Sequence, residues 1–180
     1  HADEDQPAQV APAQERADLI AVLNRVCVAA GGDRARAAEL AAADGFSPTP
    51  AEAVPFVRNT SERAGFIRST GADMTYVMLG KMTRRLGRET VTMDMCAVSS
   101  RPTDHRALVS RLREVMGFAA IRGGGFDAYV WLQTPEGRAP SRDLSDQQFL
   151  HMARTGQMRM VALDRSGSGS TLAYLLPRVD

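Results

Sequence analysis

Apolar residues recur with two different periods along the 180-residue chain, and the clearest pattern lies in its middle third. Residues 74–79 and 89–99 are rich in β-branched and other apolar side chains and flank the short polar segment 81–88, which predicts a β-hairpin. After Pro102 the apolar residues recur at helical spacing up to Gly117, a residue type that tolerates the positive φ found just past many helix ends. This stretch therefore predicts a helix packed on a sheet.

The segment before this hairpin has helical periodicity. One apolar face extends over residues 19–30 and ends at Gly31-Gly32. Asp33 is a suitable N-cap for a second, alanine-rich helix that continues to about residue 43, and Gly45 follows as its stop. The pattern predicts an N-terminal helical hairpin.

The last third of the chain alternates between strand and helix signals. A capping box at Ser145 opens a short helix that closes at Gly156. In the strand before it, Tyr129 and Trp131 share one face and the apolar Val130 lies on the other. Strands are predicted at residues 118–122, 126–133, 158–164 and 171–176.

Strands joined by short turns pair antiparallel, so these elements predict an α+β fold. We expect a mainly antiparallel sheet of about five to six strands, with helices packed on one face and the helical hairpin in front. This order is similar in layout to small sensor or scaffold folds of the profilin or PAS type, which implies nothing about function. Residues 15–180 are expected to form a single domain.

Residues 1–14 are polar and rich in Ala, Pro and Gln, so we expect a disordered lead-in. Such a start is typical of a mature chain after signal-peptide cleavage, which predicts a periplasmic or secreted protein. His1 is alternatively the remnant of a tag, in which case Ala2 is the native start. Basic residues are almost all arginine, with Lys81 the single lysine, and alanine is abundant, which is typical of a GC-rich bacterial genome.

The composition argues against a nucleic-acid partner and against a membrane span. A formal net charge of +1 lacks the basic excess of a nucleic-acid-binding chain, so no nucleic-acid partner is predicted. No stretch reaches the roughly 20 apolar residues that span a bilayer, so no membrane span is predicted.

The two cysteines are a disulfide candidate. Cys27 lies on the apolar face of the first predicted helix and Cys96 lies in a central strand. An even number of cysteines in an exported chain favours a bond between them. The alternative is that both are buried thiols that pack as small apolar side chains.

The sequence predicts no catalytic residue, metal site or cofactor. His1, His105 and His151 have no second ligand at a metal-binding spacing, and no G-x-S-x-G elbow is present. The glycine run 123–125 is followed by a strand pattern rather than by the helix that a phosphate loop requires. We therefore expect a protein that is not an enzyme.

Two sets of residues are candidates for binding. Arg84, Arg85 and Arg88 crowd the turn of the central hairpin, where they form either a solvated loop or a patch for a phosphate, a carboxylate or an acidic partner. Tyr129 and Trp131 are either an exposed aromatic contact surface or residues covered by a helix.

The sequence thus favours an exported bacterial accessory or binding protein without catalytic activity. Its expected partner is an unidentified protein or a small acidic ligand. One alternative is a small-molecule sensor that holds its ligand between sheet and helix near Trp131. Another is an enzyme whose site is assembled only in three dimensions, around His105 or His151 and an arginine.

Overall fold

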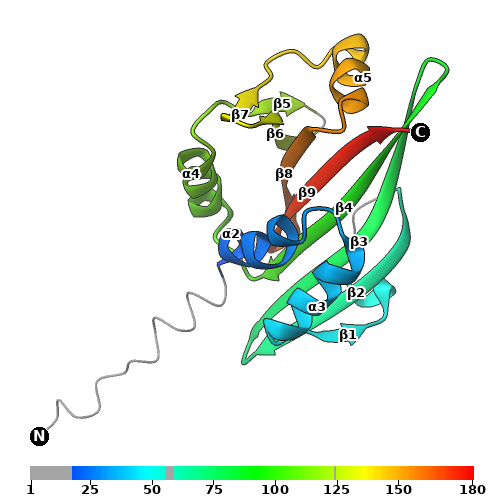
Figure 1. Cartoon of the computed structure of the whole chain (residues 1–180). Coiled ribbons are helices and arrows are strands. Elements are labelled where there is room, and N and C mark those ends of the chain that lie inside the picture. Colours follow the sequence, from blue (N-terminus) through cyan, green and yellow to red (C-terminus); the bar gives the residue numbers. More distant parts are fainter. Residues whose placement is uncertain (1–17, 56–58, 124) are drawn as a thin grey trace, which may run out of the picture.

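The computed structural model describes residues 18–55, 59–123 and 125–180. The predicted lead-in at residues 1–14, with His1, lies outside these ranges, as does Gly124 of the glycine run. The described residues combine helices with one large antiparallel sheet, so the predicted α+β class is confirmed (Figure 1). The sheet has nine strands rather than five to six.

The structure has these elements. The helical segments are α2 (Leu19–Val22), the π-helix η2 (Leu23–Val28), α3 (Arg34–Ala43), the 3-10 helix η3 (Ala51–Ala53), α4 (His105–Met116) and α5 (Asp146–Arg154). The strands are β1 (Ser47–Thr49), β2 (Thr60–Thr70), β3 (Asp73–Leu86), β4 (Glu89–Arg101), β5 (Ile121–Gly123), β6 (Phe126–Thr134), β7 (Gly137–Pro140), β8 (Met158–Ser166) and β9 (Gly169–Val179).

The strands follow one another in the order β1-β2-β3-β4-β9-β8-β6-β5, and β7 pairs with β6. The predicted hairpins β3–β4 and β8–β9 therefore lie in the interior of the sheet. The turn between β3 and β4 is shorter than expected, because Leu86 pairs directly with Glu89 and leaves two residues, Gly87 and Arg88. The segment 81–88 was predicted as a turn, but most of it is strand, since charged side chains outside the core do not interrupt the backbone ladder.

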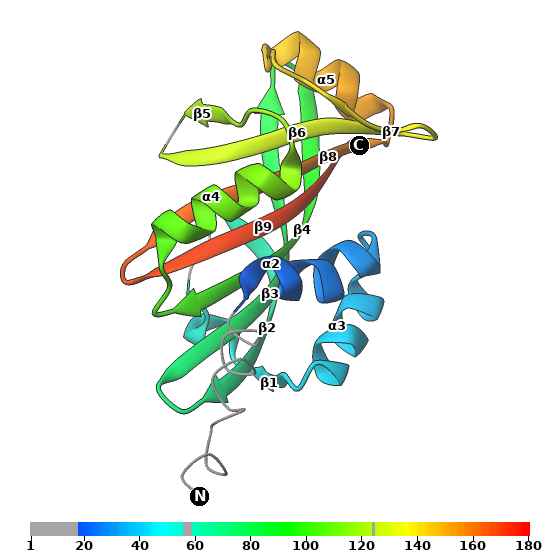
Figure 2. The same cartoon turned by 90° about the vertical axis from the view of Figure 1, so that its left-hand side faces the viewer.

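One side of the sheet, the α4 face, is covered by α2, η2, α3 and α4 (Figure 2). Leu108 and Leu112 of α4 pack in the same apolar cluster as Val98 of β4 and Leu172 of β9. The periodicity that predicted these helices thus marks the residues that cover the sheet.

The opposite side, the α5 face, has its own apolar cluster, which includes Phe149 and Met152 of α5. The prediction that the helices pack on one face is therefore wrong for α5. Strand residues alternate between the two faces, so Met95 of β4 lies in this cluster while its neighbour Cys96 lies in the other. An amphipathic pattern shows which side of a helix is buried, but not which face of a sheet it covers.

The predicted disulfide between Cys27 and Cys96 is present, with a distance of 5.4 Å between the two Cα atoms. Cys27 belongs to η2, and Cys96 belongs to β4, which lies between β3 and β9 in the sheet. The bond therefore holds the N-terminal helical segment on the middle of the α4 face.

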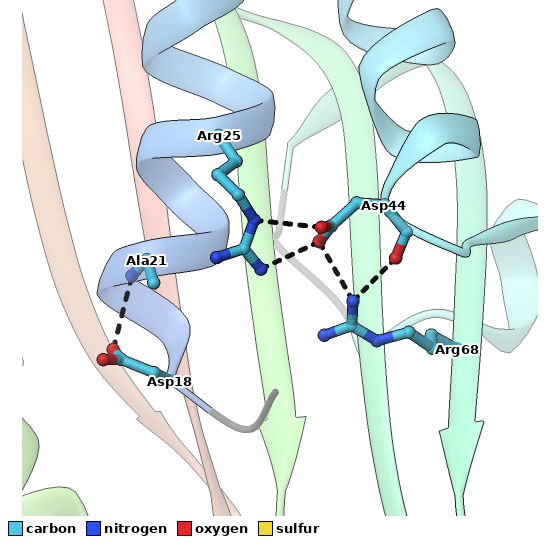
Figure 3. Close-up of polar contacts among 5 residues, drawn as sticks. All are labelled: Asp18, Ala21, Arg25, Asp44 and Arg68. Carbon is cyan, nitrogen blue, oxygen red and sulfur yellow. Dashed lines mark hydrogen bonds and ion pairs between the residues drawn. The ribbon is translucent and has the colours of Figure 1, made fainter. Parts of the chain in front are cut away.

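A second link joins the N-terminal helix to α4. Asp18 is the N-cap of α2 and accepts a hydrogen bond from the backbone N–H of Ile20. It also accepts one from the backbone N–H of Ala21 (Figure 3). Its other carboxylate oxygen accepts a 2.8 Å hydrogen bond from Arg111 of α4. Burial acts to raise the pKa of Asp18, but the Arg111 contacts and the backbone hydrogen bonds outweigh it, and the pKa is lowered.

Replacing Asp18 by Asn is expected to lower the unfolding free energy at pH 7 by about 0.5–1 kcal/mol, because Asn keeps the cap but loses the charge that faces Arg111. The folded-state pKa lies below the ordinary 3.8, so the carboxylate stabilises the fold above that value, and the contribution is lost as the pH falls through the folded pKa. Urea unfolding at pH 7 and pH 3 measures both effects.

The control is Asp33→Asn at the N-cap of α3, where the carboxylate accepts from Arg36 N–H and pairs with no cationic side chain among the described residues. Asp33→Asn should lower the unfolding free energy at pH 7 by less than Asp18→Asn does. Equal losses in the two variants would show that the Asp18–Arg111 pair does not stabilise the fold.

Candidate functional site

A groove of about 510 Å³ opens beside the C-terminal end of α4, where residues 117–120 cross to β5 and β6. We call it the α4–β6 groove. Its apolar lining comes from Phe118, Ala119, Ala120 and the ring of Tyr129, and its charged lining from Arg113, Glu114, Arg122 and Asp127.

Local sequence explains how these elements meet. Gly117 adopts φ +75° and its N–H bonds the carbonyl of Arg113, which ends α4. The next residue, Phe118, then packs edge-on against Tyr129 and Trp131, with ring centroids 5.8 and 6.3 Å away. These contacts place the segment that follows α4 against the strand that forms the floor of the groove.

Tyr129 is the most deeply placed polar residue of the groove. Only 3% of the residue is exposed, but its hydroxyl oxygen is reached by solvent, and no hydrogen bond joins this hydroxyl to another described residue. In contrast, the buried Tyr76 donates to Met74 Sδ at 3.7 Å. Burial raises the pKa of Tyr129, and Asp127 adds to this, while Arg113 and Arg122 oppose it. The phenol therefore remains protonated at neutral pH and can both donate and accept.

The charged lining of the groove is unevenly paired. Arg122 lies opposite Asp127 in the β5–β6 register, and its Nε is 3.6 Å from the Asp127 carboxylate. Glu114 acts electrostatically on Arg111, the residue that holds Asp18. Neither Glu114 nor Arg113 forms an ion pair within the described ranges.

The arginines predicted as one cluster are divided by the strand. Arg84 lies in β3, where its guanidinium is 3.6 Å from the Asp146 carboxylate and 5.4 Å from the Phe149 ring centroid, so it supports α5. Arg85 is exposed on the opposite side of the strand and Arg88 lies exposed in the turn. The structure does not bring the three together on one surface.

The aromatic pair predicted as a binding surface is covered. Tyr129 and Trp131 are each 3% exposed and belong to the core of the α4 face. Trp131 donates to Gln133, and Arg138 lies 4.9 Å from its ring centroid. The structure therefore leaves no exposed aromatic surface there, and only Tyr129 of the two lines the α4–β6 groove.

His105 forms a Ser–His contact, with Nδ1 2.8 Å from Ser170 Oγ. Ser170 is 0% exposed, and its cross-strand neighbour Ser100 is 1% exposed, so neither hydroxyl is open to a substrate. The contact joins the first turn of α4 to β9. His151 is exposed on α5, and within the described ranges no three His, Cys, Asp or Glu residues are grouped so as to hold a metal ion.

A polar network on the α4 face also has a structural role. Arg25 binds both oxygens of the Asp44 carboxylate, at 2.9 and 3.0 Å (Figure 3). Arg68 donates to the carbonyl of Asp44 at 2.7 Å and to its carboxylate at 3.0 Å, and its guanidinium lies 4.6 Å from the Phe46 ring centroid. The Asp44 carboxylate is thereby paired with two cations and joins η2 and β2 to the end of α3.

Comparison with known proteins gives no match: no family model, no curated protein and no solved structure is significantly similar to this chain. The site therefore has to be interpreted from its own residues.

Of the groove residues, sequence reasoning singled out only Tyr129. Arg113 was not considered as a candidate, and Phe118 was assigned to the predicted strand at residues 118–122. The available signal was an aromatic residue directly after the helix-ending Gly117, a position that often packs back on the fold.

Proposed function

We propose that this is an exported, non-catalytic binding protein whose ligand occupies the α4–β6 groove. The observation that carries the proposal is the Tyr129 hydroxyl, which forms no hydrogen bond with a described residue and is reached by solvent from the groove, although the residue as a whole is only 3% exposed. A ligand in the groove could therefore donate a hydrogen bond to this hydroxyl or accept one from it. The volume of the groove also lies within the range of about 300–1,000 Å³ common for ligand pockets.

Export is supported by the Cys27–Cys96 disulfide, because bonds of this kind persist in the periplasm or outside the cell. The arginine-rich, alanine-rich composition supports a bacterial source. Separately, no helix in the described part of the chain is both long and apolar enough to cross a membrane.

Binding is favoured over catalysis by the chemistry around the groove. Of the two carboxylates in its lining, that of Asp127 faces Arg122 at 3.6 Å. The described residues of the lining include no Ser, Cys, His or Lys, so they lack a nucleophile paired with a base in the usual arrangements. The Ser170–His105 contact is the nearest approach to such an arrangement, and its serine is fully buried.

The test is a fragment screen by ¹⁵N–¹H NMR on the disulfide-bonded chain, with neutral, anionic and cationic fragments. We expect saturable shifts for the amides of residues 113–122 and 127–129. If no fragment perturbs these amides, the groove is not a ligand site. Perturbations confined to Arg85, Arg88 and their neighbours would instead favour a binding surface on the β3–β4 hairpin.

A small-molecule sensor is a second candidate, because Phe118 links the groove to the aromatic core. The same ring that lines the groove contacts Trp131, so an occupied groove would alter the surroundings of the single tryptophan. A sensor predicts a change in Trp131 fluorescence and in the conformation beyond the groove on ligand addition. A binding protein predicts local changes alone.

A further inference from the structure

The α4–β6 groove combines a hydrogen-bond donor, a cation and an apolar wall. Tyr129 offers a protonated hydroxyl, Arg113 a guanidinium without an ion pair among the described residues, and Phe118 an aromatic edge. A carboxylate is a strong acceptor for both donors, and guanidinium–carboxylate pairs are among the stronger hydrogen-bonded contacts in proteins.

We infer that the groove binds a small organic acid, with its carboxylate between Tyr129 and Arg113 and its apolar body against Phe118, Ala119 and Ala120. The inference rests on the proposed binding function of the groove and specifies the chemical class of the ligand.

The two acidic residues of the groove differ in how strongly they repel a bound carboxylate. Asp127 is held by Arg122 on the adjacent strand, which offsets its charge. Glu114 acts electrostatically on Arg111 but, like Arg113, forms no ion pair with a described residue, so its charge opposes a bound anion more than that of Asp127 does. Arg113 is the cation that remains for a ligand.

The electrostatic surroundings of Tyr129 agree with an anionic ligand. Among the charges that act on its hydroxyl, Arg113 has the largest effect, and Arg122 adds to it, against Asp127 alone. The partial negative charge at the C-terminal end of α4 disfavours an anion on the helix axis. One of the carbonyls there, that of Arg113, already accepts a hydrogen bond from Gly117 N–H. The carboxylate is therefore placed on the Tyr129 side of the groove.

The experiment compares three probes of similar size: benzoate, its neutral analogue benzamide and the cation benzylamine. Dissociation constants come from NMR titration of the groove amides. We expect benzoate to bind about tenfold more tightly than benzamide, because hydrogen bonds to a charged acceptor are the stronger ones, and benzylamine to bind most weakly.

Two variants test the assigned contacts. Tyr129→Phe keeps the ring and removes the hydroxyl, and Arg113→Gln removes the charge; each should weaken benzoate binding about five- to tenfold and leave benzamide binding less affected. The control is Arg106→Gln, an exposed arginine in the first turn of α4, away from the groove, which should leave binding unchanged. Amide spectra of each variant establish that it is folded.

Each outcome has a distinct meaning. If benzamide or benzylamine binds in the groove as tightly as benzoate, or if Tyr129→Phe and Arg113→Gln bind benzoate like the wild type, the organic-acid inference is wrong and the groove remains a binding site. The same holds if benzoate does not bind while another fragment of the screen does. If neither the three probes nor any fragment shifts the groove amides, both the inference and the proposed function fail.

Discussion

Replacing Cys27 and Cys96 together by alanine is expected to lower the unfolding free energy by about 4 kcal/mol. The bond joins residues 69 positions apart, and a cross-link of this span restricts the unfolded chain by roughly that amount in the chain-entropy model. Both side chains are nearly buried, at 1% and 9% exposed, so alanine loses some packing in addition. Urea unfolding monitored by far-UV circular dichroism gives the midpoint and the slope.

Reduction provides the matched comparison for this variant. A thiol-free phosphine should shift the wild-type midpoint towards that of the double variant and leave the double variant unchanged. Mass spectrometry after alkylation shows whether both thiols are blocked before reduction. The prediction is contradicted if the two proteins unfold at the same urea concentration, or if both cysteines of the untreated protein react with iodoacetamide.

The second large effect is expected for Phe149, whose side chain packs from α5 into the apolar cluster of the α5 face. Its ring is 2% exposed and lies beneath the guanidinium of Arg84. Phe149→Ala should lower the unfolding free energy by about 3–5 kcal/mol, because it leaves a cavity in a fully buried cluster. The variant should also loosen α5, which hydrogen exchange of its amides would detect.

Phe126 supplies the control for this substitution, since it is the same residue type but 43% exposed at the start of β6. Phe126→Ala should change the unfolding free energy by no more than about 0.5 kcal/mol. Comparable losses in the two variants would mean that α5 does not pack on the sheet as described.

The helix ends were the most predictable part of this fold. Asp33 caps α3 through Arg36 N–H, Ser145 caps α5 through Gln148 N–H, and Gly117 adopts the left-handed conformation after α4. Each of these depends on a local hydrogen bond or on the φ of one residue, so the identities of a few neighbouring residues suffice to predict it.

The strand count was underestimated for equally local reasons. In β2, Glu62 has a positive φ and the register shifts between Ser61 and Ala64, so the alternation that marks a strand is interrupted. β1 and β7 are only three and four residues long and contain proline. Such strands exist because a longer neighbour provides the pairing, which no pattern within them reveals.

The groove was the least predictable feature. Arg113, Arg122 and Tyr129 come from α4, β5 and β6, and only the pairing of β5 with β6 and the turn at Gly117 bring them together. The alternation in β6 correctly placed Tyr129 and Trp131 on one face, but both faces of this sheet are covered. Alternation alone cannot separate a covered face from an open one.

The way the sheet ends has a consequence for the protein at high concentration. Its two outermost strands, β1 and β5, are each three residues long, and the part of β2 that β1 does not cover contains the irregularity at Glu62. A neighbouring molecule would therefore meet few consecutive N–H and C=O groups in a straight row. Short and irregular edges of this kind discourage intermolecular strand pairing, so the long β3–β4 and β8–β9 hairpins are kept from templating aggregation.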